Sequence, residues 1–259
     1  MKTVLRLLLV VFNAALAMPS QAAGEIKVLI SGGFSGPYRQ LVPQFEHDSG
    51  LKVATASGAS QGSGPQTIKA QLERGTRTDV VIMSREGLAE LMTAGRIAAG
   101  SDVDLARTPL GVAVRAGAPK PKVATVEEFK ALMLRSRTVS VPASTSGIFL
   151  AKDVFPRLGL EGRVQLKAMP RGTEAAALVA AGEADAAVMP VSEIVNAPGV
   201  ELAGVLAPEI QLNQVFAAAV VSDAIEPQAA RRLIAFLASP GAAPAIGAGG
   251  MEPLGPQRP

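Results

Sequence analysis

One local pattern recurs along the chain and limits the folds open to it. It consists of a short apolar strand, a polar loop rich in Ser, Thr and Gly, and an amphipathic helix, and its first copy spans residues 26–45. The apolar residues Ile26, Val28, Leu29 and Ile30 predict a buried strand. Tyr38, Leu41 and Phe45 fall on one face of the helix that follows. Strands and helices that alternate in this way predict an α/β fold with mostly parallel strands.

The polar loop occurs four times, and the copies form two pairs. They lie at residues 31–35, 57–64, 142–147 and 169–173. This coarse duplication predicts two similar lobes, each a mostly parallel sheet flanked by helices, that face each other across a ligand cleft.

The same spacing predicts where the chain passes between the lobes. We expect crossings near residues 107–110 and near residues 208–216. Residues 23–108 together with 209–259 would then form lobe 1, and residues 109–208 would form lobe 2.

Side chains before several helices match known capping patterns. Ser35 is expected to cap the first helix, and Thr125 with Glu128 forms a capping box. Ser63 with Gln66 predicts a second box of the same kind.

The first residues have the pattern of an export signal. Lys2 and Arg6 precede an apolar run, and residues 20–22 provide a small-x-small cleavage sequence. We expect a signal peptide over residues 1–22, cut after its last residue or, alternatively, after Ala23. No later stretch is apolar and long enough to span a bilayer, so the mature protein is expected in the periplasm without a membrane anchor.

Composition excludes several classes of function. The chain has no cysteine, which excludes disulfides, thiolate catalysis, cysteine zinc sites and a lipid-anchored lipoprotein. Without the two cations of the signal the formal charge falls from +3 to +1, and no basic block is present, so a nucleic-acid partner is not expected. With no Trp and one Tyr, the chain cannot build an aromatic cage, and a ligand should be held by hydrogen bonds and dipoles.

The chain offers few groups for catalysis. Its one histidine, His47, lies at the polar end of the first helix. Asp79 and Asp185 each precede a buried strand and are interpreted as structural end-caps. The sequence contains no G-x-S-x-G, Walker A or H-E-x-x-H motif. We therefore expect neither an enzyme nor a cofactor or metal site, and a periplasmic hydrolase is the less favoured alternative.

Four Ser/Thr/Gly loops at strand-to-helix turns favour an anion cradle built from neutral N–H and O–H donors and helix dipoles. Residues 25–36, 45–53, 58–64, 79–82 and 182–185 together resemble the periplasmic molybdate-binding proteins of ABC importers, over nearly the whole mature chain. The resemblance implies a two-lobed type II periplasmic binding protein, expected as a monomer, that holds an oxyanion between its lobes and delivers it to a membrane permease.

The resemblance also implies which residues contact the ligand. The expected contacts in the first two loops are Ser31, Gly33, Phe34, Ser60, Gln61, Gly62 and Ser63. The expected contacts in the last two loops are Thr145, Ser146, Gly147, Arg171, Gly172 and Thr173.

Two positions depart from the family pattern. Gly33 stands where molybdate binders carry a serine, and Pro190 stands where they often carry a tyrosine. Molybdate or tungstate is the predicted ligand. Gln61 and Arg171 suit a carboxylate, so a small organic acid is the alternative.

Overall fold

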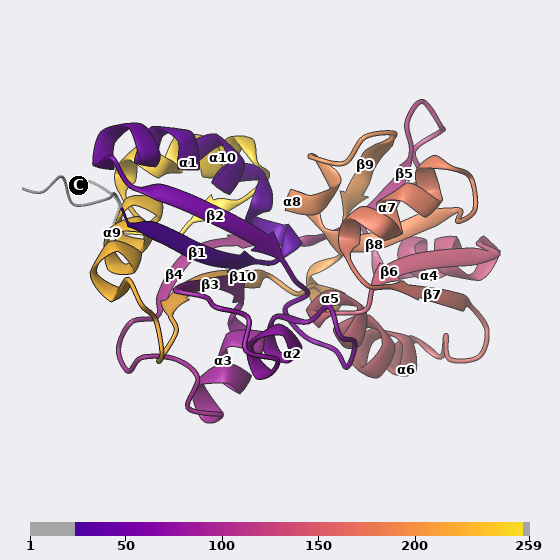
Figure 1. The fold of residues 1–259 in the computed structure, drawn as a ribbon. Coiled ribbons are helices and arrows are strands. Elements are labelled where there is room, and N and C mark those ends of the chain that lie inside the picture. Colours follow the sequence, from indigo (N-terminus) through magenta and orange to yellow (C-terminus); the bar gives the residue numbers. More distant parts are fainter. Residues whose placement is uncertain (1–23, 256–259) are drawn as a thin grey trace, which may run out of the picture.

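The computed structural model describes residues 24–255 and shows two lobes side by side (Figure 1). The expected signal peptide and its cleavage site lie outside the described residues. Among the helices of residues 24–255, none combines the length and apolar character that crossing a membrane requires.

The first lobe is built on a mixed sheet. Its strands within the described range are, in spatial order, β11 (Glu252–Pro253), β4 (Val103–Thr108), β10 (Gln214–Val220), β3 (Val80–Ser84), β1 (Glu25–Ile30) and β2 (Lys52–Ser57). β1 is parallel to β2 and β3, whereas β10 is antiparallel to both β3 and β4.

Helices cover both faces of this sheet. They are η1 (Gly32–Phe34), α1 (Ser35–Ser49), α2 (Ile68–Glu73), α3 (Arg85–Thr93), α9 (Pro227–Leu237), η4 (Pro240–Ala242) and α10 (Ala243–Ala248). Val28 packs in a core with α1, α9 and α10, and its neighbour Leu29 packs in a second core with α2 and α3. Because successive strand residues point to opposite faces and both are covered, the last three residues of β1, Val28 to Ile30, are all apolar and buried.

The second lobe repeats the plan. Its strands within the described range are, in order, β7 (Gln165–Met169), β6 (Thr138–Pro142), β8 (Ala186–Pro190), β5 (Leu110–Arg115) and β9 (Val200–Val205). Its helices are α4 (Val126–Arg135), α5 (Thr145–Phe149), the π-helical turn η2 (Leu150–Val154), α6 (Phe155–Leu158), α7 (Gly172–Ala180), α8 (Val191–Ile194) and η3 (Pro208–Ile210). β6 is parallel to β7 and β8, and β5 is antiparallel to β8 and β9.

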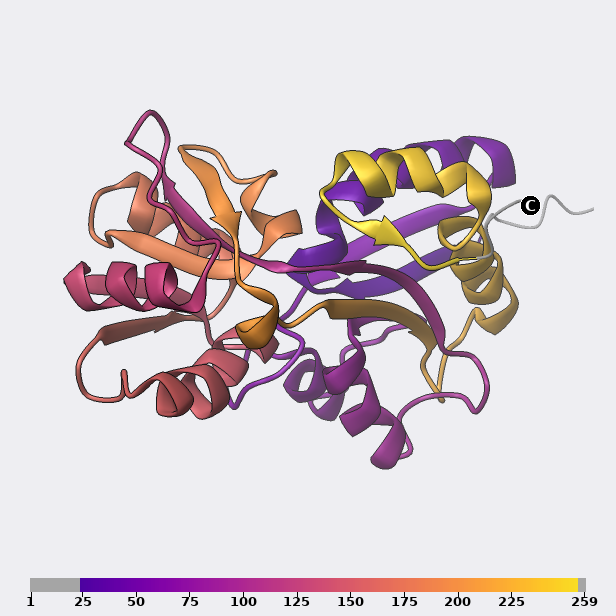
Figure 2. The same cartoon turned by 180° about the vertical axis from the view of Figure 1, so that it is seen from behind.

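Two extended segments join the lobes, as the reverse view shows most clearly (Figure 2). One runs from β4 into β5 through Pro109, and the other returns from η3 to β10. The Gln211 side chain ties the two together, since its Oε1 accepts the Leu110 N–H at 2.7 Å and its Nε2 donates to the Leu110 carbonyl at 3.2 Å.

The caps agree only in part with the sequence patterns. The capping box of Thr125 and Glu128 is confirmed. The Ser63–Gln66 box is wrong, because α2 begins later and Thr67 caps it. Ser35 is also not a cap: η1 leads directly into α1, so Ser35 is already helical and its hydroxyl donates to the Gly32 carbonyl at 2.7 Å.

Candidate functional site

A cavity of about 20 Å³ lies where the polar loops of the two lobes meet. A space of this size holds about one water molecule. The residues that line it include Ser31, Gly32, Ser60, Thr145, Ser146, Arg171, Gly172, Glu193, Gln214 and Phe216. Both lobes therefore contribute to its wall, and Gln214 and Phe216 come from β10, where the returning segment ends.

On one side of the cavity, side chains join the lobes. Thr145 Oγ1 donates to Gln61 Oε1 at 2.8 Å and lies 2.8 Å from Ser84 Oγ. The Gln61 backbone N–H donates to Ser144 Oγ at 3.1 Å. Ser60 Oγ accepts the Ser84 N–H at 2.9 Å. These hydroxyls close the cleft on this side and hold each other in place.

Other polar groups of the wall are buried without a partner. Among the described residues, Ser31 Oγ and Gln214 Oε1 make no hydrogen bond, although each residue is only 4% exposed. A buried polar atom without a partner carries a desolvation cost of about 1–3 kcal/mol. Both residues line the cavity, so a bound ligand that bonds to them would remove this cost.

Arg171 provides the positive charge of the cavity wall. It is the N-cap residue of α7, whose first N–H groups start at Gly172. The guanidinium lies 3.1 Å from Glu174 Oε1, and the side chain is 43% exposed. Arg171 and the positive end of the α7 dipole together suit a carboxylate.

Glu193 brings a negative group to the same cavity. It lies on α8, directly after the central strand β8, and α8 contacts η1 of the other lobe. Its Oε2 atom is buried and has no hydrogen-bond partner among the described residues. Burial raises the pKa of Glu193 from 4.5 to about 7, because a buried carboxylate loses hydration.

Several expected contact residues lie elsewhere. Phe34 is fully buried in the first-lobe core, and a Cβ at Gly33 would lie 1.9 Å from Phe216 Cζ. Four more line a groove of about 690 Å³ outside the cavity, namely Gln61, Gly62, Ser63 and Gly147. Thr173 faces another outer groove, of about 590 Å³. The expected residues that line the cavity itself are Ser31, Ser60, Thr145, Ser146, Arg171 and Gly172.

Glu193 and Gln214 line the cavity but are not among the contacts expected from the sequence. A usable signal existed for Glu193, since it follows the carboxyl end of a buried strand, where ligands of α/β sheets bind. Pro190, the position noted in the sequence, is the last residue of β8 and pairs with Leu110.

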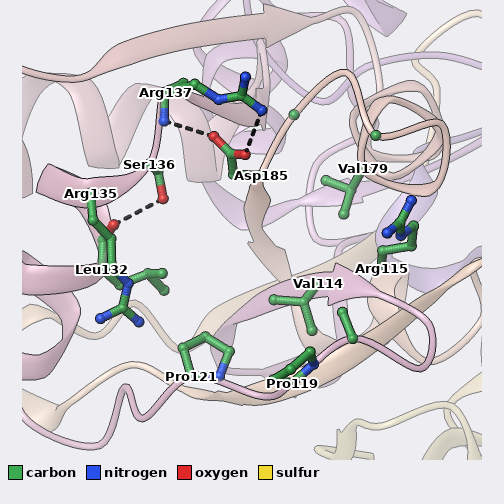
Figure 3. Close-up of a pocket in the computed structure, with 13 residues that line it drawn as sticks. Val114, Arg115, Pro119, Pro121, Leu132, Arg135, Ser136, Arg137, Val179 and Asp185 are labelled. Atoms are coloured by element: carbon green, nitrogen blue, oxygen red, sulfur yellow. Dashed lines mark hydrogen bonds and ion pairs between the residues drawn. The ribbon is translucent and has the colours of Figure 1, made fainter.

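A second pocket, of about 480 Å³, lies within the second lobe (Figure 3). Arg115, Arg135 and Arg137 line it together with Asp185, which accepts the Arg137 N–H at 2.7 Å. Hydrogen bonds from the backbone N–H groups of Thr138 and Arg137 outweigh the effect of burial and lower the pKa of Asp185. A ligand here would touch one lobe alone.

The fold and the cleft define a solute-binding class. The family model for bacterial extracellular solute-binding proteins matches residues 26–252, and the chain belongs to this family. The chain is also 35% identical to aconitate isomerase from Pseudomonas sp. over 238 residues, which cover 92% of this chain and 91% of that protein.

Solved structures show the same fold. The Azotobacter vinelandii periplasmic molybdate-binding protein is 20% identical, with a TM-score of 0.66, and the match covers 87% of this chain and 98% of that one. AgtB from A. tumefaciens R10 in complex with agropinic acid is 18% identical, with a TM-score of 0.67 and coverage of 89% and 83%. The two-lobed α/β fold expected from the sequence is thus confirmed.

Proposed function

We propose that the protein works in the periplasm and binds a small organic polycarboxylic acid, such as aconitate, between its lobes. The relative at 35% identity, named aconitate isomerase, supports this choice of ligand. Arg171 and the N-terminus of α7 would hold one carboxylate, and Ser31 and Gln214 would bond to other oxygens.

The observation that carries the proposal is the Glu193 carboxyl in the cavity wall. The closed cavity holds about one water molecule, so the lobes would have to part for either ligand. Molybdate carries its charge on all of its oxygens, so the ionised form of Glu193, whose pKa is about 7, would repel it wherever it sat beside that carboxyl. An extended acid can place its carboxylates toward Arg171 and a carbon atom against Glu193. The organic acid, the alternative ligand of the sequence analysis, is therefore favoured over molybdate.

Two uses of the bound acid follow. As a member of a solute-binding family, the protein would pass the acid to the permease of an ABC importer. The second candidate is that it isomerises the acid in the cleft, which is favoured by the name of the relative. The first use needs a closed cleft that reopens, and the second also needs a group that moves a proton.

Calorimetric titration of the mature protein with cis-aconitate, citrate, molybdate and sulfate tests the ligand class. We expect saturable binding of aconitate or citrate and no heat with molybdate. Arg171→Ala should weaken binding of the acid by about 2–5 kcal/mol, because it leaves a carboxylate without its counter-charge. Arg135→Ala, in the pocket of the second lobe, is the matched control and should leave the affinity unchanged. Molybdate heat without heat from any acid would contradict the proposal.

A further inference from the structure

The carboxylate of Glu193 lies in a slot formed by glycines of both lobes. A Cβ at Gly32 of the first lobe would lie 2.6 Å from Glu193 Oε2, and a Cβ at Gly172 of the second would lie 1.8 Å from the same atom. Any other residue at Gly172 would displace the carboxylate. The absence of a side chain at these two positions thus lets the carboxylate reach the cavity.

Glu193 separates two spaces. On one side it lines the small cavity, and on the other it lines the outer groove of about 590 Å³ between α1 and α7. Gly32 also lines both spaces. Four alanines of α7 and its C-terminal end line this groove, namely Ala176, Ala177, Ala180 and Ala181. An acid that enters from the groove would meet the carboxylate before it reaches the cavity.

The carboxylate has no counter-charge of its own. In the cavity and the groove, the other charged side chains among the described residues are Arg39 and Arg171. Arg39 lies 3.5 Å from Ser35 Oγ, and Arg171 is paired with Glu174. Burial alone raises the pKa of Glu193 to about 7. A buried carboxylate without a counter-charge lowers the free energy of unfolding. With a pKa near neutrality, the group is suited to accept a proton and return it.

We propose that Glu193 is the catalytic acid–base of the cleft. This inference rests on the proposed binding of an unsaturated polycarboxylic acid. The carboxylate removes a proton from the methylene carbon next to a carboxylate of the acid. That C–H bond breaks, and its electron pair moves into the allylic system. The double bond shifts by one carbon, and the protonated Glu193 returns the proton to the former vinyl carbon.

The step conserves atoms and electrons. One C–H bond breaks and one forms, no oxidant or reductant takes part, and Glu193 ends as it began. The negative charge that develops spreads onto the adjacent carboxylate of the acid. Arg171 and the first N–H groups of α7 lie in the same wall and would stabilise it.

Proton exchange in D₂O tests the proposal directly. The mature protein is incubated with cis-aconitate, and NMR follows both deuterium uptake at the methylene and vinyl carbons and the appearance of the trans isomer. We expect the wild type and Glu161→Gln, an exposed glutamate of the same lobe, to catalyse both. Glu193→Gln should bind the acid within about threefold of the wild-type affinity and lose about 100- to 10,000-fold in rate.

The alternative outcomes separate the two proposals. Wild-type protein that binds aconitate without exchange or isomerisation would overturn the role of Glu193 and leave the binding function standing. No binding of any acid would remove both. Exchange by Glu193→Gln at the wild-type rate would also overturn the role.

A second variant covers a failure of Glu193→Gln to fold. Gly172→Ala keeps the glutamate and displaces its carboxylate, so exchange should again be lost. The wild-type rate should rise with pH up to about 7 and then level off.

Discussion

The buried carboxyl of Glu193 should make the free energy of unfolding depend measurably on pH. Below pH 4.5 the group is protonated in both the folded and the unfolded chain and contributes nothing. Between pH 4.5 and 7 the folded protein keeps the proton that the unfolded chain loses, so the free energy of unfolding falls as the pH rises. Above pH 7 the carboxyl is ionised in both the folded and the unfolded chain, and the full destabilisation of the folded protein is present.

The size of this cost follows from the shift. One pKa unit corresponds to about 1.4 kcal/mol, so a rise from 4.5 to about 7 corresponds to a destabilisation of about 3 kcal/mol. Glu193→Gln removes the ionisation at every pH. The stability of Glu193→Gln relative to the wild type should therefore increase by about 3 kcal/mol from about pH 4 to about pH 8, whatever the amide costs in packing.

Urea unfolding of both proteins at several pH values measures this difference. Glu161→Gln is the control, because its side chain is exposed. Carboxylates with lowered pKa values change the free energy of unfolding over a different pH range. The hydrogen bond from Arg85 lowers the pKa of Asp102, so the stabilisation from Asp102 is lost only as the pH falls below about 4. Parallel profiles for Glu193→Gln and the wild type would refute the reasoning.

Three further substitutions test separate parts of the structure. Gly172→Ala should move the Glu193 carboxylate out of the cavity and change the free energy of unfolding by less than about 1 kcal/mol, as thermal unfolding would show, because the clash is with the end of a flexible side chain. Ser60→Ala should lower that free energy by about 1–3 kcal/mol in urea unfolding, since it leaves a buried N–H without its acceptor. Thr125→Ala should cost about 1 kcal/mol in the same assay through loss of the capping box of α4, without effect on ligand affinity.

The pattern of strand, polar loop and helix was sufficient to predict the two-lobed fold. It identified the strands with continuous apolar runs, because these are buried on both faces. The pattern does not predict β4 and β9, because both mix polar and apolar residues. Asp104 and Arg107 interrupt the apolar residues of β4, and Glu201 interrupts those of β9. β9 lies at the edge of its sheet, where one side is not covered by another strand.

The loops that line the cleft were predictable, but their contacts were not. Ser31, Ser146 and Gly172 lie in strand-to-helix turns of single lobes, the family resemblance implies them as ligand contacts, and they line the cavity. The setting of Glu193 depends instead on the approach of two lobes, since Gly32 and Gly172 belong to segments that are far apart in the sequence. No local pattern contains that information.

The central claim is that an organic acid binds between the lobes. Amide NMR spectra of the mature protein during titration with cis-aconitate test it most directly. We predict that the Gly32, Ser146 and Gly172 signals shift together and saturate, and that molybdate leaves them unchanged. Shifts confined to the second-lobe pocket around Arg115 and Arg137, or a response to molybdate alone, would contradict the account.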